Sequence, residues 1–212
     1  MIVLVVEGAI GAGKSTLLQV LSESFSQKYK VVTITEPVDL WLDTGALQDF
    51  YSDIKGKAYE FQTFAFATRI QKVTKVFKEN PDADIYIIER SPYSDRYIFM
   101  QMMEDAGYLT ENQKIKYKIW WETWMELWPF LPTHFIHLNP GLTACLQRVQ
   151  ARSRDGESQV DSQYEKDLID QHRTFFLSHC PHPTLNLDTD IDFRTQEGKA
   201  EIVDKVTQFL NL

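Results

Sequence analysis

Five short apolar runs are spaced along the chain, and each has the length of a β-strand. They predict strands over residues 2–6, 31–35, 84–89, 133–138 and 184–187. The third run, DIYIIE, is the most strongly apolar of them. Runs of this length and composition indicate strands rather than helices when turn residues flank them.

Between these runs, apolar positions recur at the helical spacing of three to four residues. The pattern predicts helices from about residue 14 and over about 58–79, 93–106, 111–128, 142–152, 160–178 and 197–210. Strands that alternate with helices predict an α/β fold with a parallel sheet covered on both faces. We find no repeat, low-complexity run or linker, so residues 1–212 are expected to form one domain.

Composition narrows the class of protein further. The chain has 212 residues, of which 43% are hydrophobic, and this suits one domain with a full core. Its net charge of -8 argues against binding a nucleic-acid polymer, although a local cluster can still hold a small anion. Two cysteines give no disulfide framework and fit a reducing compartment. Without a recognisable signal peptide or membrane span, we expect a cytoplasmic protein that does not enter a membrane.

The segment GAIGAGKST lies between the first predicted strand and the first predicted helix, and it fits the phosphate-binding pattern G-x-x-x-x-G-K-S/T. Glycines there let backbone N–H groups surround phosphates, and the helix N-terminus adds a favourable dipole. Lys14 would reach the outer phosphates, and the Ser15 hydroxyl is placed for Mg²⁺. A chance match is disfavoured by the flanking strand and helix. The predicted ATP-binding residues of this loop are Gly8, Ala9, Ile10, Gly11, Ala12, Gly13, Lys14, Ser15 and Thr16.

A GTPase would need two further motifs that this chain does not supply. The segment DIKG at residues 53–56 has the spacing of a D-x-x-G switch but follows no apolar strand, and the sequence contains no N-K-x-D. The third predicted strand instead ends in Glu89, Arg90 and Ser91. Glu89 is placed to help hold the metal, and Arg90 would point toward a transferred phosphoryl group.

The second predicted strand ends in Glu36, which Pro37 holds in an extended conformation. A carboxylate at the end of a buried strand is costly unless it has a partner or a function. Beside a phosphate loop, Glu36 can accept the proton of an attacking hydroxyl group. Four aromatic residues are candidate walls for a flat acceptor, with ordinary core packing as the alternative for each. They are Trp41, Tyr51, Phe61 and Phe99.

Three arginines, Arg148, Arg152 and Arg154, lie where the fifth predicted helix runs into the polar stretch RSRDGESQ. In a chain of net charge -8, so close a group suggests a clamp for an anion, and phosphoryl transfer needs such cations. The alternative is a solvated helix face.

Together these segments resemble the deoxyribonucleoside kinase family. The matching pieces are GAIGAGKST, EPVDLW, FQ at 61–62, ERSPYSDRYIF and RVQARSRDGE, which occur in the order of the family across essentially the whole chain. The resemblance implies a P-loop kinase-like three-layer fold with a five-stranded parallel sheet and an arginine-rich lid at about residues 152–160. It also implies a homodimeric, Mg²⁺-dependent enzyme of nucleotide salvage. Such an enzyme transfers the γ-phosphoryl group of ATP to the 5′-hydroxyl of a deoxyribonucleoside.

The resemblance assigns roles on the acceptor side of the site. Glu36 would be the general base, and Arg90 would also contact the 5′-oxygen. Tyr51 and Glu157 would hold the 3′-hydroxyl, and Gln62 would read the edge of the base. Two of the aromatic walls implied in this way are Trp41 and Phe99. The short connector between Trp41 and Tyr51 departs from the pattern of the family.

On the donor side, the resemblance implies that Arg148, Arg152 and Arg154 close over ATP. The segment LDTDIDF resembles the loop that reads adenine, which makes Asp192 and Phe193 further candidates for ATP binding.

Two residues bear on the choice of base. Arg69 lies seven residues after Gln62, on the same face of the 58–79 helix, and Asp95 lies in YSDRY. Deoxycytidine and deoxyguanosine kinases have an arginine and an aspartate at these places. The resemblance therefore implies a preference for deoxycytidine and purine deoxynucleosides over thymidine. The alternative is that Arg69 and Asp95 form an ordinary surface pair.

Other interpretations stay open at this stage. WWETWMELW places Trp120, Trp124 and Trp128 on one helical stripe, which indicates either core packing or a dimer face.

A nucleoside monophosphate kinase is an alternative function, but TEPVDLWLD contains no basic residue to hold the acceptor phosphate. A non-catalytic nucleotide-binding module is another, although every expected catalytic position is filled.

Overall fold

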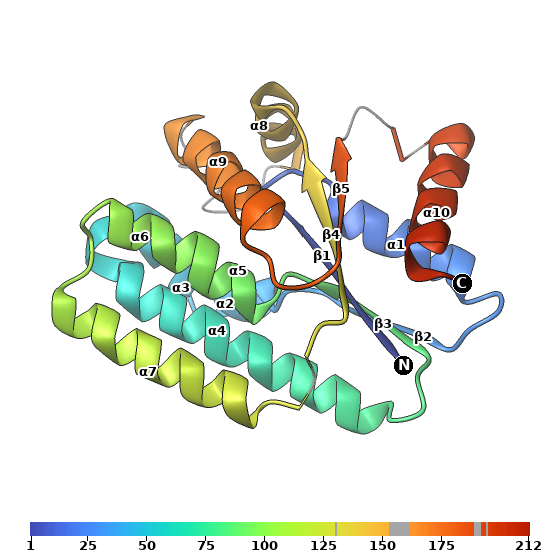
Figure 1. The fold of residues 1–212 in the computed structure, drawn as a ribbon. Helices are drawn as coiled ribbons and strands as arrows, with labels where there is room; N and C mark the ends of the chain where they lie inside the picture. Colours follow the sequence, from blue (N-terminus) through green and yellow to red (C-terminus); the bar gives the residue numbers. More distant parts are fainter. Residues whose placement is uncertain (130, 153–161, 189–191, 194) are drawn as a thin grey trace.

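The computed structural model describes residues 1–129, 131–152, 162–188, 192–193 and 195–212. Its centre is a five-stranded parallel sheet in the order β2-β3-β1-β4-β5 (Figure 1). The strands are β1 (Ile2–Gly8), β2 (Val31–Ile34), β3 (Ile85–Glu89), β4 (His134–Asn139) and β5 (Thr184–Asp188). All five match the predicted runs to within a few residues, so the predicted parallel α/β sheet is confirmed.

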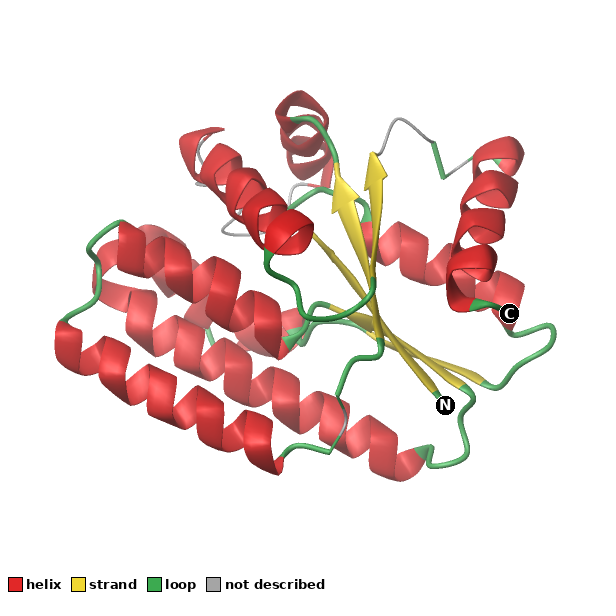
Figure 2. Ribbon diagram, viewed as in Figure 1, coloured by secondary structure: helices red, strands yellow, loops and turns green. Residues whose placement is uncertain are grey.

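Helices cover both faces of this sheet, as Figure 2 shows. The helices of the described residues are α1 (Lys14–Phe25), α2 (Val38–Asp43), α3 (Ala46–Ser52), α4 (Ile54–Glu79), α5 (Pro92–Ser94), the π-helix η1 (Asp95–Met100), α6 (Gln101–Asp105), α7 (Glu111–Leu127), α8 (Leu142–Arg152), α9 (Ser162–Ser178) and α10 (Gln196–Leu210). In the part of the chain that the structure describes, none of them has the length and apolar character needed to cross a bilayer.

The alternation of side chains along β1 divides the core into two halves. Val3 and Val5 belong to the cluster formed with α4, α7 and α9, whereas Leu4 and Val6 belong to the cluster formed with α1 and α10. Successive residues of a strand point to opposite faces of its sheet, so a strand covered on both faces needs apolar residues at every position. This explains why the central strands β1 and β3 are nearly continuous apolar runs, whereas the edge strand β5 alternates between polar and apolar residues over 184–187.

The order of the strands determines where a ligand can bind. β1 lies between β3 and β4, so the chain fills one side of the sheet before it crosses to the other. In open parallel sheets, ligands bind beyond the carboxyl ends of the strands at this change of direction. The phosphate loop follows β1, while Glu36 and Glu89 lie at the carboxyl ends of β2 and β3.

The long helix α4 begins at Ile54, earlier than the predicted start at residue 58. Its N-cap is Asp53, whose carboxylate accepts a hydrogen bond from the N–H group of Gly56. The D-x-x-G spacing of DIKG is therefore a helix start and not a nucleotide switch.

Two features of the fold differ from the sequence prediction. The segment between Glu36 and α4 contains the short helices α2 and α3, which we did not predict; Gly45, at φ 73°, separates them. The predicted helix over 93–106 contains the π-helical turn η1, which carries Asp95 and Phe99. A π-turn changes the direction of side chains relative to a regular helix and is common at functional sites.

Candidate active site

The phosphate loop connects β1 to α1 and requires glycine at specific positions. Gly11 has φ 73°, and a Cβ atom there would lie 2.6 Å from the backbone oxygen of Cys145. Gly13, with φ 99°, precedes the first residue of α1. Both backbone conformations are ones that residues with side chains rarely adopt. The loop therefore has the backbone conformation that would let N–H groups and a helix N-terminus meet an anion, while ATP binding by these residues stays a prediction.

Lys14 lies at the base of this loop and is buried. Its Nζ donates to the carbonyl oxygens of Gly8 at 3.3 Å and Ala9 at 3.1 Å. Burial, and next the positive charge of Arg90, lower the pKa of Lys14 to about 8. The ammonium group thus lies within the loop, where the phosphates of a nucleotide would provide stronger partners than two carbonyls.

Ser15 and Glu89 form the predicted metal position. The Ser15 hydroxyl donates to the Glu89 carboxylate, with Oγ 3.2 Å from Oε1 and 3.4 Å from Oε2. Glu89 pairs with Val6 in the β1–β3 ladder, which places it next to the start of the phosphate loop. A hydroxyl and a carboxylate are hard oxygen donors of the kind that Mg²⁺ uses beside phosphates. These two residues therefore fit the ion that a nucleotide would bring.

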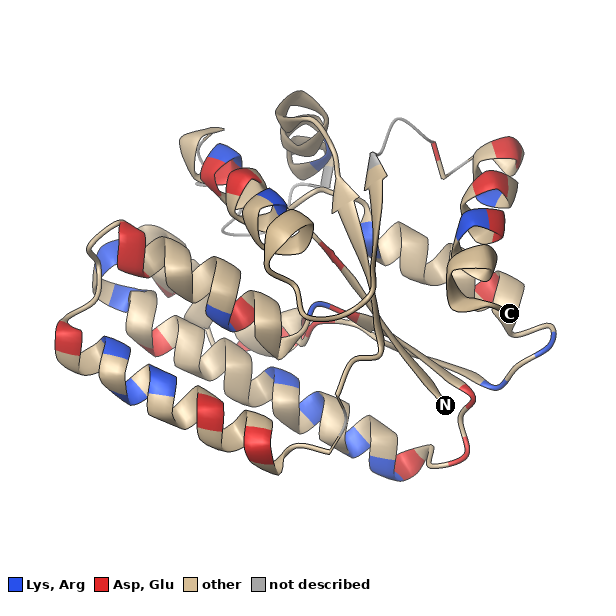
Figure 3. Cartoon of the chain, viewed as in Figure 1, with Lys and Arg blue, Asp and Glu red and all other residues tan. Residues whose placement is uncertain are grey.

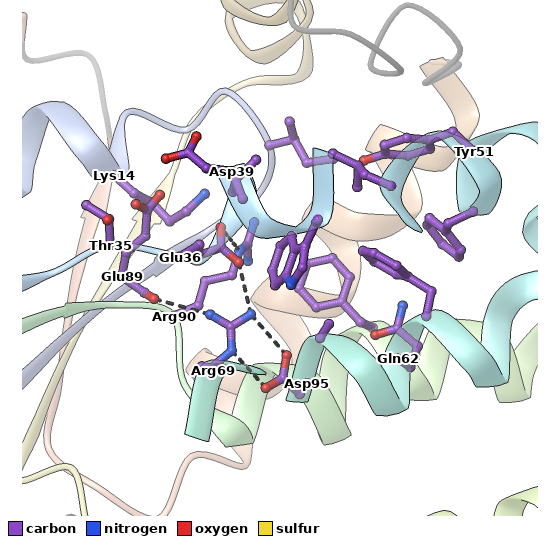
Figure 4. Close-up of a pocket in the computed structure, with 18 of the residues that line it drawn as sticks. Lys14, Thr35, Glu36, Asp39, Tyr51, Gln62, Arg69, Glu89, Arg90 and Asp95 are labelled. Atoms are coloured by element: carbon purple, nitrogen blue, oxygen red, sulfur yellow. Dashed lines mark hydrogen bonds and ion pairs between the residues drawn. The ribbon is translucent and has the colours of Figure 1, made fainter. Parts of the chain in front are cut away.

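A cavity of about 250 Å³ opens from this loop toward α4 (Figure 4). It is lined by Lys14 and Glu89 at one end and by Tyr51 and Gln62 at the other, and Ser15, which is bonded to Glu89, also lines it. The cavity brings together all but one of the predicted nucleoside-binding residues: Glu36, Trp41, Tyr51, Phe61, Gln62, Arg69, Arg90, Asp95 and Phe99. The exception, Glu157, lies outside the described residues.

Glu36 is held by two guanidinium groups. Arg69 Nη2 donates to Oε1 at 2.9 Å, and Arg90 Nε donates to Oε2 at 3.2 Å. Burial alone would raise the pKa of Glu36, but the charges of Arg90 and Arg69 outweigh it and lower the pKa to about 2. The carboxylate is consequently ionised at neutral pH.

Arg69 also forms a two-point ion pair with Asp95. Its Nε lies 2.9 Å from Oδ2 and its Nη2 lies 3.2 Å from Oδ1. Both side chains are buried, with exposed fractions of 4% and 1%. The pair lines the cavity, so the alternative of a surface pair is wrong.

Aromatic rings shape the far end of the cavity into a slot. Phe61 stacks on Phe50 with ring centroids 4.6 Å apart, and Trp41 meets Phe61 edge-on at 5.6 Å. Trp41 is fixed by a hydrogen bond from Nε1 to the hydroxyl of Thr68 at 2.9 Å. Gln62, on the same helix as Phe61, is 2% exposed and lines the cavity. The slot suits a flat ring with polar groups on its edge.

The predicted donor-side residues are only partly within the described chain. Arg148 Nη1 donates to the carbonyl oxygens of Gly11 and Ala12, each at 3.3 Å, so it lies against the phosphate loop although the residue is exposed to solvent. Phe193 is buried and lies 3.7 Å from where a Cβ of Gly13 would be. Asp192 precedes Phe193 and follows a stretch outside the described residues.

Arg152 is the last residue of α8. Arg154 and the rest of the predicted lid lie outside the described residues. The predicted lid therefore stays a prediction.

Several lining residues were not found from the sequence. They are Thr35, Val38, Asp39, Leu47, Phe50, Ala65 and Tyr164. Ala65 could have been identified, because it lies on the same face of α4 as Gln62 and Arg69. Leu47 and Phe50 were missed because α3 was not predicted, and Tyr164 because α9 approaches the cavity from a distant part of the chain.

The tryptophan stripe is divided between core and surface. Trp121 and Trp128 are buried, and half-buried Trp120 packs on Phe66 with centroids 4.7 Å apart. Trp124 is 40% exposed. Core packing is thus confirmed for part of the stripe, while the exposed part remains available for a partner.

Comparison with known proteins agrees with this geometry. The sequence model of the deoxynucleoside kinase family matches residues 4–211. A probable deoxycytidine kinase of fowlpox virus is 30% identical over 211 residues, covering 97% of this chain and 87% of the viral protein. Deoxycytidine kinase 2 of Gallus gallus is 28% identical, and mitochondrial deoxyguanosine kinase of Xenopus laevis is 29% identical. Each of these two alignments covers 97% of this chain, with 89% of the Gallus gallus protein and 88% of the Xenopus laevis protein.

Proposed function

The chain belongs to the deoxynucleoside kinase family, and we propose that it transfers the γ-phosphoryl group of ATP to the 5′-hydroxyl of a deoxyribonucleoside. The observation that carries this proposal is the position of Glu36. Its carboxylate lies in one cavity with Lys14 of the phosphate loop and with the aromatic slot around Phe61. A nucleoside with its base in the slot would direct its sugar hydroxyl toward Glu36.

Glu36 would accept the proton of the attacking hydroxyl. A carboxylate has about four lone-pair positions, so it can accept this bond while Arg69 and Arg90 keep theirs. A pKa of about 2 makes Glu36 a weak base. In a loose, metaphosphate-like transition state, the attacking hydroxyl transfers its proton late. The position of that hydroxyl therefore matters more than the strength of the base. The two arginines supply that positioning.

The donor side would be organised by Lys14, Ser15, Glu89 and Arg148. Lys14 would exchange its carbonyl partners for the outer phosphates, and Arg148 would add positive charge beside the loop. Ser15 and Glu89 would hold Mg²⁺, which neutralises charge on the phosphate oxygens. Arg152 and Arg154 would complete the clamp over ATP.

The pair of Arg69 and Asp95 supports a preference for deoxycytidine and purine deoxynucleosides over thymidine. Asp95 can accept a hydrogen bond from an exocyclic amino group, and Arg69 can donate one to a ring nitrogen or carbonyl. Thymine presents a carbonyl where Asp95 needs a donor, and its methyl group requires extra room. Each buried polar group left unpaired costs about 1–3 kcal/mol.

A nucleoside monophosphate kinase remains the second candidate. The structure adds one cation near Glu36 that the sequence did not indicate, because Lys72 Nζ lies 3.3 Å from the Glu36 carbonyl oxygen. The same ammonium donates to the hydroxyl of Thr35 at 3.0 Å, and Lys72 does not line the cavity. This arrangement favours a neutral acceptor over a phosphorylated one.

A substrate panel tests the proposal. The purified enzyme is given ATP and Mg²⁺ with each of the four deoxyribonucleosides, the matching ribonucleosides and the matching monophosphates. We expect 5′-phosphorylation of deoxycytidine and the purine deoxynucleosides, with thymidine the poorest of the four. Phosphorylation of monophosphates alone, or no ATP-dependent product, would overturn it.

We also propose that the protein acts as a cytoplasmic homodimer in nucleotide salvage. Ile115, Ile119, Trp124 and Leu127 of α7 are exposed. Acidic and basic side chains are interspersed along α7 as they are along α9 and α10, as Figure 3 shows. An exposed apolar group of this kind is typical of a protein interface. Light scattering coupled to size exclusion should give twice the mass of one chain, and replacing Ile119 and Trp124 with Glu should halve it.

A further inference from the structure

Arg90 has an unusual backbone conformation. Its φ is 62°, and among the described residues the only other non-glycine residue with positive φ is Asn211 at the end of α10. The N–H group of Arg90 donates to the carbonyl oxygen of Val6 at 3.0 Å, which fixes the turn after β3. A bulky residue persists in the left-handed region only where its surroundings hold it, and such residues concentrate at functional sites.

The guanidinium group of Arg90 is enclosed on several sides. Its Nε donates to Glu36 at 3.2 Å, and its Nη1 lies 3.2 Å from Nε2 of His172. The group also lies over the ring of Phe99, at 4.7 Å from the centroid, and Nη1 lies 3.9 Å from Oε2 of Glu7. Only 3% of the side chain is exposed.

The hydrogen bonds of His172 define its protonation. His172 is 1% exposed and lies on α9, where its Nδ1 is 2.7 Å from the carbonyl oxygen of Leu168. A carbonyl only accepts, so Nδ1 carries the hydrogen; a guanidinium only donates, so Nε2 accepts from Arg90. Burial, and next the charge of Arg90, hold the pKa of His172 well below its usual range. The neutral ring therefore keeps the lone pair that Arg90 uses.

Glu7 competes for the same nitrogen of Arg90. Its Oε1 accepts from the hydroxyl of Ser91 at 2.7 Å, but its Oε2 is buried without a hydrogen-bond partner among the described residues. Without His172, Arg90 Nη1 would gain most by turning toward this unsatisfied oxygen. That rotation would draw Nε away from Glu36.

We infer that His172 is a positioning residue for phosphoryl transfer, because it holds the guanidinium of Arg90 in the orientation that contacts Glu36. The inference rests on the proposed function of Arg90 and Glu36. His172 lies 82 residues from Arg90 in the chain and belongs to no motif that we recognised in the sequence. It acts through Arg90 and does not line the cavity.

Two amide variants separate positioning from a structural role. His172→Gln keeps an acceptor oxygen near the place of Nε2, whereas His172→Asn keeps a donor near Nδ1 for Leu168 and removes the contact with Arg90. We expect His172→Asn to lower kcat by about 10-fold or more, with nucleoside KM changed by less than about 3-fold. His172→Gln should recover most of the lost kcat. The reverse order, with Asn more active than Gln, would show that only the bond to Leu168 matters.

His134→Asn is the matched control, since His134 lies at the opposite end of β4 from the site. It should leave kcat within about 2-fold of the wild type. A loss as large as that of His172→Asn would attribute the effect to general damage from replacing a histidine and would overturn the inference.

A measurement without turnover keeps the inference separate from the proposed function. Long-range ¹H–¹⁵N NMR of the wild-type enzyme near neutral pH should show His172 with Nδ1 protonated and Nε2 unprotonated. Replacing Arg90 with Lys should shift the Nε2 resonance. A protonated Nε2, or a resonance that does not respond to Arg90→Lys, overturns the contact even if the enzyme is active. If the wild type phosphorylates no nucleoside, the proposed function fails, and the NMR result alone decides whether His172 holds Arg90.

Discussion

Arg69 donates a hydrogen bond to Glu36, from Nη2 to Oε1, across 2.9 Å. The same guanidinium holds Asp95 by two further bonds. Since Arg69 and Asp95 are the proposed readers of the base, the groups that select the substrate are directly bonded to the proposed general base. Changes at Arg69 are therefore expected to alter turnover as well as selectivity.

Replacement of Glu36 tests the proton acceptor. Glu36→Gln keeps the shape of the side chain and removes its basicity and charge, so we expect kcat to fall by about 100-fold or more with nucleoside binding largely retained. Steady-state kinetics and calorimetric titration with nucleoside measure the two quantities. Glu36→Asp keeps the charge on a shorter side chain, so its kcat should lie between those of the wild type and of Glu36→Gln. Near-normal turnover by Glu36→Gln would exclude Glu36 as the base.

Replacement of the buried ion pair tests base selectivity. The double variant Arg69→Met with Asp95→Ala removes the mismatch with thymine, so the ratio of kcat/KM for thymidine to that for deoxycytidine should rise about 10-fold or more. The kcat for deoxycytidine should fall, because Glu36 loses a partner. The control is the Arg96–Glu104 pair, joined at 3.0 Å outside the cavity. Arg96→Met with Glu104→Ala should leave the ratio unchanged, and a wild type that prefers thymidine would refute this interpretation of the pocket.

The 3′-hydroxyl is the third point of recognition. Tyr51 lines the cavity, and with Glu157 it is proposed to bind that group. Loss of a buried partner costs about 1–3 kcal/mol, so 2′,3′-dideoxynucleosides should have kcat/KM values about 10- to 100-fold below their parents. Tyr51→Phe should reduce this difference, whereas Tyr108→Phe, a change outside the cavity, should not. Equal kcat/KM for a dideoxynucleoside and its parent would contradict the assignment.

Glu7 gives a prediction for stability against pH. Burial raises its pKa from 4.5 to about 7, against the opposing effects of Arg90 and Ser91. The folded chain then binds this proton more tightly than the unfolded chain, so its contribution to the free energy of unfolding decreases as pH rises from about 4.5 to about 7. Gln does not titrate. Relative to the wild type, Glu7→Gln should therefore gain about 2 kcal/mol in unfolding free energy between about pH 5 and 8.

Urea unfolding at a series of pH values measures this difference. Exposed Glu126 supplies the control, because Glu126→Gln should follow the wild type at every pH. A constant offset between Glu7→Gln and the wild type would mean that Glu7 titrates normally in the folded protein.

The centre of the sheet could be predicted because β1 and β3 are buried on both faces. A run such as DIYIIE has few alternatives to a central strand, and the structure places it as β3 with every residue from Ile85 to Glu89 buried. The phosphate loop, Glu36 and the residues of α4 could also be predicted from the sequence, because their motifs or helical spacing are local in the chain.

The remaining features depend on contacts between distant segments. α2 and α3 are short, and packing on α4 stabilises them more than their own sequence does. The bond from Arg69 to Glu36 joins residues 33 apart, and no local pattern encodes it. The orientation of Arg90 depends on Glu7 and His172, which lie on β1 and α9. Sequence patterns identified the pair of Arg69 and Asp95, but not the bonds that join Arg69 and Arg90 to Glu36 or Arg90 to His172.

Helix α4 is 26 residues long and thus extends about 39 Å. Phe61, Gln62 and Arg69 all face the cavity from this one helix, while the phosphate loop is formed by β1 and α1 on the other side of the cavity. Mutations that accumulate along one face of α4 can thus change which nucleoside is accepted while leaving the ATP half intact. Arg69, through its bond to the Glu36 carboxylate, couples the choice of base to turnover, so descendants of this sequence can diversify in substrate range more freely at the other cavity-facing positions of α4.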